Sequence, residues 1–310
     1  MLNSNKINIE LFCELTGIQI SDLTPSFINK IDKLNLQFNF INKDREENFI
    51  YEYKKIIFED DLKKSGPARI NDWESGWNEN LEIYKINSTE LSLIPKYIKK
   101  SSFFRINGRL AESSNEYFEY ILTKLHHQAI ALKFLKEFDS IYEFGCGTGI
   151  NLIFFNEVLP SKKFIGLDWC ESSKRIINEV RKNNDINLRF ETFNFFESRK
   201  INFENNSAVC TVTSLEQVGK EFKNFIDLLV REKPGIVIHI EPIVDWYNMD
   251  SEIESLSVYY HKKRGYLDGL LGYLEELEGK KLISILAKFK TQFGESRHNP
   301  FSLIVWRPNS

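Results

Sequence analysis

The sequence predicts an α/β fold in residues 115–310, preceded by a mainly helical cap in residues 1–114. From about residue 115, short apolar strands alternate with helical segments of about 10–15 residues. This alternation is typical of a doubly wound, mostly parallel sheet with helices on both faces. Near the C-terminus two strand-like segments follow one another with no helical pattern between them, which predicts one antiparallel strand. The 310 residues suffice for two units of ordinary size.

Apolar residues recur at helical spacing over 24–64, with charged residues between them, so helices are expected there. Residues 65–67, Ser-Gly-Pro, interrupt that pattern. An aromatic and acidic cluster follows, from Trp73 to Trp77. Its two tryptophans are candidates for stacking on a planar or sugar ring of a substrate, and packing between the cap and the rest is the alternative.

The later elements are expected in regular order. The expected helices span residues 116–137, 150–158, 171–183, 220–232 and 252–278. The expected strands span residues 140–144, 163–168, 187–193, 207–213, 236–240, 281–290 and 301–307. The ten-residue loop between the last two strands is too short for a parallel crossover, so we expect a hairpin.

The composition narrows the possible partners and the location. There are 41 Lys and Arg against 44 Asp and Glu, a net charge of -3, which disfavours nucleic acid or an anionic membrane as a partner. No apolar run of about 18 residues exists to insert into a membrane. The four cysteines lack metal-ligand spacing and suit reduced thiols in the cytoplasm, so we expect no metal. The oligomeric state stays open.

The sharpest feature is the segment from Glu143 to Gly149, Glu-Phe-Gly-Cys-Gly-Thr-Gly, between a strand and a helix. Alternating glycines let the backbone turn tightly and approach a ligand, and the helix start offers unpaired N–H groups. A dinucleotide loop has the spacing GxGxxG, whereas the spacing here is GxGxG. The Glu143 carboxylate would repel a pyrophosphate, but it suits an ammonium or sulfonium group.

The next two strand ends carry groups that suit a nucleoside. Asp168, nineteen residues after Gly149, can accept the hydroxyl protons of a ribose. Trp169 is expected either against a purine face or in the core. After the third strand, Asn194 can pair with an adenine edge beside Phe195, although asparagine is also a common turn residue.

Residues 115–310 resemble the class I S-adenosylmethionine-dependent methyltransferases. The resemblance rests on the segment from Glu143 to Gly149, on Asp168 and on the C-terminal hairpin. It implies a seven-stranded sheet of order 3-2-1-4-5-7-6 with strand 7 antiparallel, and S-adenosylmethionine as cofactor. The implied cofactor residues are Glu143, Gly145, Cys146, Gly147, Asp168, Trp169, Asn194, Phe195 and Ser214. Cys146 is expected to be a small filler in the loop.

In such a fold the methyl acceptor lies over the carboxyl ends of strands 4 and 5. The residues placed there to meet a substrate are Glu216, Gln217, Glu241, Asp245 and Trp246. Glu216 and Glu241 are candidate catalytic carboxylates. The chain lacks the Asn/Asp-Pro-Pro-Tyr motif of amino-directed enzymes and the Pro-Cys dipeptide of cytosine C5 chemistry.

Residues 259–266 combine aromatic residues, three cations and an imidazole. They are interpreted either as a solvated helix face or as a substrate-anion site, with His261 as general base and Arg264 binding the substrate. His239, inside a strand, is expected to be buried with its hydrogen bonds satisfied. His126 and His127 suggest no role.

The sequence therefore predicts a cytoplasmic methyltransferase acting on a small or medium polar molecule, such as a sugar, a sugar nucleotide or a secondary metabolite. O-methylation is favoured over N- or C-methylation. Two alternatives stay open: an RNA- or protein-modifying methyltransferase, which requires a basic stripe near the cleft, and a non-catalytic module that only binds the cofactor.

Overall fold

The computed structural model describes residues 5–95, 103–197 and 200–309. Its larger sheet has seven strands in the order β10-β12-β9-β8-β5-β6-β7. The strands are β5 (Ser140–Phe144), β6 (Lys163–Asp168), β7 (Leu188–Thr192), β8 (Ser207–Val212), β9 (Ile236–Glu241), β10 (Ile283–Phe289) and β12 (Ser302–Pro308). β5 to β9 are parallel, and β12 runs antiparallel to both β9 and β10. The predicted order 3-2-1-4-5-7-6 and the antiparallel last strand are confirmed.

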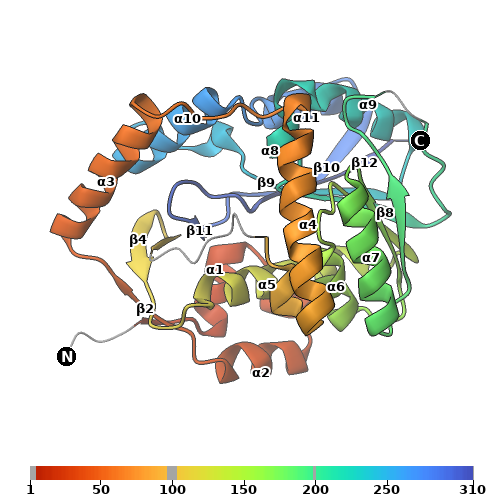
Figure 1. Ribbon diagram of the computed structural model, residues 1–310, viewed down its shortest axis with the longest axis horizontal. Helices are drawn as coiled ribbons and strands as arrows, with labels where there is room; N and C mark the ends of the chain where they lie inside the picture. Colours follow the sequence, from red (N-terminus) through yellow and green to blue (C-terminus); the bar gives the residue numbers. More distant parts are fainter. Residues whose placement is uncertain (1–4, 96–102, 198–199, 310) are drawn as a thin grey trace.

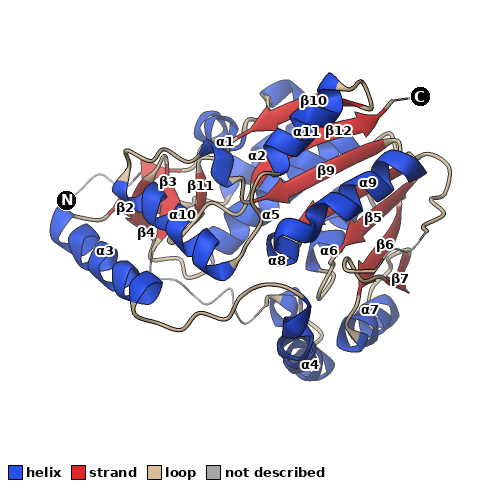
Figure 2. Ribbon diagram, turned by 90° about the horizontal axis from the view of Figure 1, so that it is seen from above, coloured by secondary structure: helices blue, strands red, loops and turns tan. Residues whose placement is uncertain are grey.

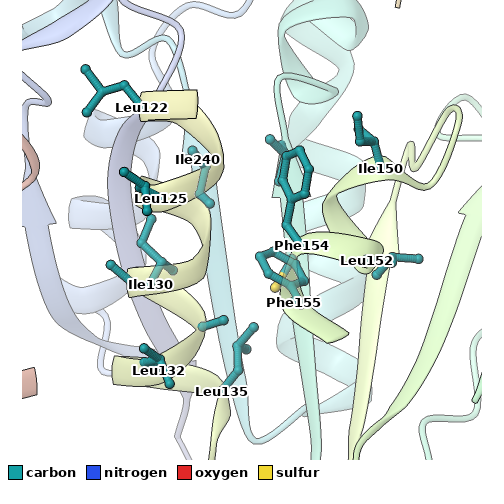
Figure 3. Packing of buried hydrophobic residues seen from close by; sticks show 14 of the residues in the cluster. Leu122, Leu125, Ile130, Leu132, Leu135, Ile150, Leu152, Phe154, Phe155 and Ile240 are labelled. Carbon is teal, nitrogen blue, oxygen red and sulfur yellow. The ribbon is translucent and has the colours of Figure 1, made fainter. Parts of the chain in front are cut away.

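Helices cover both faces of this sheet, as predicted (Figure 2). One face packs against α5 (Phe118–Ile130), α6 (Ile150–Val158) and α7 (Glu171–Asn183), and the other against α8 (Leu215–Val218), α9 (Phe222–Glu232) and α11 (Leu270–Gly279). Neighbouring strand residues alternate between the two cores because side chains alternate along a strand. Figure 3 shows part of the first core, with Leu125 and Ile130 on α5, Phe155 on α6 and Ile240 on β9.

The segment before α5 contains helices and also strands that the sequence pattern does not reveal. Its elements are β1 (Asn5–Lys6), α1 (Ile9–Thr16), α2 (Pro25–Lys33), β2 (Gln37–Phe40), α3 (Lys43–Phe58), α4 (Ile70–Asn87), β3 (Phe104–Ile106) and β4 (Arg109–Glu112). The strands form a second sheet, β1-β2-β4-β3-β11, whose last member is β11 (Phe293–Glu295). Two to four residues are too few for an alternating pattern. The division at residue 114 remains a prediction, since β11 lies beyond it.

The helix expected over 252–278 is two helices, α10 (Glu252–Arg264) and α11. Gly265 ends α10 in a left-handed conformation, with φ of 64°. Glycine adopts that conformation without the Cβ penalty and is therefore a common helix terminator. The short 3₁₀ helices are η1 (Ile20–Asp22), η2 (Pro67–Arg69), η3 (Glu90–Leu93), η5 (Gly219–Glu221) and η6 (Val244–Trp246), and η4 (Ala131–Leu135) is a short π-helix. None of the helices described is long and apolar enough to span a bilayer.

Candidate active site

The glycine loop connects the end of β5 to α6. Gly145, Gly147 and Gly149 have φ angles of 72°, 52° and 75°, a region that residues with a side chain rarely adopt. The N–H groups of Gly145 and Cys146 donate to the Leu167 carbonyl at 2.7 and 3.0 Å, which ties the loop to β6. The three glycines therefore permit a backbone path that holds the loop against the neighbouring strand.

Glu143 lies under this loop and is fully buried. Asn151 Nδ2 donates to its Oε1 at 2.7 Å, while its Oε2 is buried without a hydrogen-bond partner. Burial raises the pKa of Glu143 to about 8, and the negative charge of Asp168 raises it further. The hydrogen bond from Asn151 acts in the opposite direction. An unsatisfied buried carboxylate oxygen is unfavourable, so this position suits a ligand that brings a cationic donor.

Asp168 ends β6 next to the loop. Its two oxygens accept from Gly147 N and Cys170 N, each at 2.9 Å. Burial raises the pKa of Asp168, and these two N–H groups oppose the increase. Each carboxylate oxygen has two lone pairs, so both can accept a further hydrogen bond from vicinal hydroxyls.

The side chains expected near adenine differ in their surroundings. Phe195 lies beside the glycine loop, because a Cβ added to Gly145 would be 3.4 Å from its Cε2. Asn194 makes local contacts, donating to Glu197 Oε1 at 2.8 Å and accepting from Phe196 N at 3.0 Å, as in a turn. The Trp169 ring packs near Phe196, with centroids 5.6 Å apart. Their roles toward adenine remain predictions.

Two small side chains complete the loop. Cys146 is buried, and a Cβ added to Gly166 would be 2.9 Å from its Sγ, so this thiol fills space over β6. Burial raises the pKa of Cys146 well above its usual value. Ser214 Oγ donates to the Phe144 carbonyl at 2.8 Å, and its Cβ lies 2.4 Å from where a Gly145 Cβ would be. Only glycine fits at position 145 beside Ser214.

Helix α4 brings both tryptophans to the glycine loop. Trp77 is buried, and one of its ring carbons lies 2.8 Å from where a Gly147 Cβ would be. Trp73 stacks on Trp77 at 5.5 Å. Between them, Glu74 accepts from Ser172 N and Ser172 Oγ, each at 3.0 Å, and so joins α4 to the start of α7 (Figure 1). This geometry places the tryptophans at the proposed cofactor loop, and their contact with substrate remains a prediction.

Glu241, at the end of β9, is fully buried and holds α8 in place. Its Oε1 accepts from Ser214 N and Leu215 N at 3.0 Å each, and its Oε2 accepts from Glu216 N at 3.2 Å. Burial raises the pKa of Glu241 to about 7 against these hydrogen bonds. Both oxygens are engaged with the backbone, as in a helix N-cap.

Glu216, on α8, is 6% exposed. Burial, with the carboxyls of Glu241 and Glu295, raises its pKa well above the usual value, while Arg264 opposes the increase. The neighbouring Gln217 Nε2 lies 3.4 Å from Glu216 Oε1, and Gln217 Oε1 is buried without a partner. These two predicted residues therefore lie together.

His261 is 2% exposed, so the solvated-face interpretation of α10 does not describe it. Its Nε2 lies 3.1 Å from His298 Nδ1, and its Nδ1 is buried without a partner. Burial, with His298 and Arg105, holds the pKa of His261 well below its usual value, so the ring is neutral. Arg264 lies over the Tyr266 ring at 5.0 Å, and its buried Nε has no partner.

Asp245 and Trp246 lie on η6 (Val244–Trp246). Asp245 is exposed, and after burial the acids that raise its pKa are Asp268 and Glu275. Trp246 packs against the core under α9 and α11. Among the described residues neither side chain forms a hydrogen bond with Glu216, and their substrate roles remain predictions.

The other histidines are buried. His239 accepts from Trp306 Nε1 at 3.0 Å and pairs with Thr211 at 2.9 Å, which is the satisfied state expected of it. His126 has no hydrogen-bond partner at either ring nitrogen, and its ring meets Phe293 edge-on.

Sequence reasoning missed three charged residues: Glu295, whose carboxyl raises the pKa of Glu216, and Glu119 and Arg297, which interact electrostatically with Glu295. Glu295 and Arg297 belong to the segment expected to be a plain loop, which forms β11 and the turn after it. Glu119 lies in the first turn of α5, where an acidic residue is ordinary. No sequence signal marks these positions, because β11 joins the small sheet from a distant part of the chain.

Neither a protein-family model nor a curated protein sequence matches the chain. Solved methyltransferase structures are similar to it. The methyltransferase domain of bacterial CtHen1-C is 14% identical over 61% of this chain and 99% of that one, with a TM-score of 0.44. The plantazolicin methyltransferase BpumL, in complex with SAH, is 14% identical over 78% of this chain and 98% of that one, with a TM-score of 0.42.

Human N-acetylserotonin methyltransferase, in complex with SAM, is 13% identical over 78% of this chain and 66% of that one, with a TM-score of 0.40. Because these TM-scores are low, the fold is identified from the topology of this chain. Its strand order, its strand directions and the glycine loop after β5 are those of the class I methyltransferase fold.

Proposed function

We propose that this chain is an S-adenosylmethionine-dependent methyltransferase acting on a small or medium polar acceptor. The observation that carries the proposal is the unpartnered Oε2 of buried Glu143, beneath three left-handed glycines and beside Asp168. A cofactor with an ammonium group would satisfy that oxygen. The intact loop and both acids also favour an active enzyme over a degenerate binding module.

The residues fit the cofactor as follows. Glu143 would bind its ammonium group, and Asp168 would accept from its ribose hydroxyls. Phe195 and Trp169 would pack on adenine, with Asn194 at its edge. When bound, the cofactor supplies a methyl group on a positively charged sulfur.

Methylation of a hydroxyl needs an acceptor oxygen in line with the methyl carbon and a base for the hydroxyl proton. Glu216 is our candidate for that base: burial raises its pKa well above the usual value, so the carboxyl is mostly protonated, but the fraction that ionises is a strong base. We assign Glu241 a positioning role, since its oxygens hold the backbone of α8. Neutral His261, with its free Nδ1, is the second candidate base. A base beside the acceptor favours O-methylation.

The balanced charge of the chain supports a small-molecule acceptor over RNA. Sugars, sugar nucleotides and secondary metabolites all fit a polar site of this kind. An RNA- or protein-modifying role would require a basic stripe beside the glycine loop.

Isothermal titration of S-adenosylmethionine into the wild type and Asp168→Ala tests the cofactor assignment. Loss of hydrogen bonds to a charged group is expected to weaken binding by about 1.5–3 kcal/mol. Asp185→Ala, which removes an exposed acid in the loop after α7, is the matched control. Equal affinity of Asp168→Ala and the wild type would count against the proposed site.

A further inference from the structure

The indole ring of Trp77 lies face-on against the glycine loop. Three consecutive carbons of its six-membered ring, Cε2, Cζ2 and Cη2, lie 3.2, 2.8 and 3.1 Å from where a Cβ of Gly147 would be. A point in the plane of the ring would be clearly nearer to one carbon than to both of its neighbours, so this point lies above the ring. Trp73 stacks on Trp77 with an interplanar angle of 25°, and Trp77 is 7% exposed. A buried aromatic face is therefore turned toward the loop.

Hydrogen bonds hold the helix that carries Trp77 against the loop. In the first half of α4, Glu74 accepts from the backbone and the hydroxyl of Ser172 at the start of α7, each at 3.0 Å. In the loop itself, Thr148 Oγ1 donates to the Leu93 carbonyl at 2.8 Å. Leu93 ends η3, which packs against α4. The position of the Trp77 ring over the loop is thus fixed from two directions.

The loop residue under this ring lies between the two acids proposed to bind the cofactor. Glu143 ends its strand two residues before the loop begins at Gly145, and the N–H of Gly147 donates to Asp168 Oδ2 at 2.9 Å. In S-adenosylmethionine the positively charged sulfur joins the amino-acid chain to the ribose. With the ammonium group at Glu143 and the ribose at Asp168, the sulfur would lie along the part of the loop that contains Gly147, and so on the side of the Trp77 face.

The face of an aromatic ring attracts a cation, because its π electrons make that face negative. The attraction is strongest for tryptophan, and it grows when the pair is shielded from water, as burial of Trp77 provides. The Asp168 carboxylate attracts the same charge, so a preference for a charged cofactor would not by itself identify the ring as its source. S-adenosylhomocysteine has a neutral sulfur. The ring therefore acts on the methyl-bearing form of the cofactor and hardly on the demethylated product.

We propose that Trp77 recognises the positive charge on the cofactor sulfur and so favours binding of S-adenosylmethionine over S-adenosylhomocysteine. This inference rests on the proposed function. Once the methyl group has left, the sulfur is neutral and the ring no longer holds it, which favours exchange of the product for fresh cofactor. The inference assigns Trp77 to the cofactor, whereas the sequence suggested stacking on a substrate ring or packing of the cap.

Isothermal titration of S-adenosylmethionine and of S-adenosylhomocysteine into the full chain tests the inference through the ratio of their dissociation constants. Looser packing of α4 weakens both ligands and leaves this ratio unchanged, whereas loss of the ring face weakens only the charged ligand. The preference for S-adenosylmethionine should fall by about 5- to 30-fold in Trp77→Leu, and by less in Trp77→Phe, which keeps a smaller aromatic face. Tyr84→Leu is the matched control, because Tyr84 is a buried aromatic residue further along α4, and its ratio should equal that of the wild type.

Biosynthetic replacement of the five tryptophans by 5-fluorotryptophan gives a second measurement with almost no change in side-chain shape. Fluorine withdraws electrons from the ring face, so the ratio should fall in the labelled wild type and stay unchanged when Trp77→Leu is labelled. An unchanged ratio in Trp77→Leu, or an equal fall in Tyr84→Leu, overturns the inference. If Trp77→Leu binds neither ligand, an unchanged ratio in Trp77→Phe and in the labelled wild type overturns it. A wild type that binds neither ligand contradicts the proposed function itself.

Discussion

Glu143 is expected to release a proton when the cofactor binds. Its pKa of about 8 in the ligand-free structure leaves the carboxyl about nine-tenths protonated at pH 7. An ammonium group placed at the unpartnered Oε2 favours the ionised carboxylate and lowers this pKa. Binding at pH 7 should therefore release about 0.9 proton, and about half a proton at pH 8. The affinity should accordingly rise with pH between 6 and 8.

Isothermal titration of S-adenosylhomocysteine in buffers of different ionisation enthalpy measures this number. Glu143→Gln keeps the hydrogen-bonding shape of the side chain and cannot ionise, so it should bind more weakly and release about 0.9 fewer protons than the wild type at pH 7. Subtracting the proton release of Glu143→Gln from that of the wild type removes the contribution of any proton that the ligand itself takes up, because that contribution is the same for both proteins. Equal proton release by the wild type and Glu143→Gln would refute the reasoning.

Three further outcomes are expected. All five histidines are buried with lowered pKa values, so protons favour the unfolded state. Their stabilising contribution is complete above about pH 6.5 and is lost as the pH falls toward 4, by up to about 1.4 kcal/mol per pH unit for each histidine. His126→Leu should reduce that slope in urea unfolding by one such increment, and an unchanged slope would contradict its buried neutral state. Glu241→Ala should lower the free energy of unfolding by about 1–3 kcal/mol, because the hydrogen bonds that cap α8 are lost. It should also lower kcat more than cofactor affinity, because the backbone that carries Glu216 is no longer held in place. Equal losses in kcat and in cofactor affinity would argue against a positioning role. Gly145→Ala places a methyl group 2.4 Å from Ser214 Cβ. The double variant with Ser214→Gly should recover the part of the unfolding free energy that the overlap costs. About 1–2 kcal/mol for the left-handed backbone and about 0.5–1.5 kcal/mol for the lost hydrogen bond to the Phe144 carbonyl should stay lost; no recovery would show that the overlap is not the cause.

The larger sheet could be predicted from the sequence because its strands and helices carry clear periodic patterns. β9, for example, is an unbroken run of buried residues from Ile236 to Glu241. The final hairpin followed from loop length alone. The small sheet could not be predicted, since its strands are two to four residues long and β11 pairs with β3 from the far end of the chain.

Some residues of the candidate active site could likewise be predicted from the sequence, and others could not. Glu143 and Asp168 could be predicted because each occupies a strand end with a glycine loop or a fixed spacing as its signature. The capping role of Glu241 depends on three backbone N–H groups whose positions only the folded α8 defines. Glu119 and Glu295 come from distant segments, and nothing in their sequence neighbourhood indicates that their carboxyls interact.

The most direct test of the central claim is a crystal structure of this chain grown with S-adenosylhomocysteine. The account predicts the ligand along the loop from Gly145 to Gly149, with its amino group within hydrogen-bonding distance of Glu143 Oε2 and its ribose hydroxyls at Asp168. A ligand bound elsewhere, or one whose amino group contacts neither oxygen of Glu143, would contradict it.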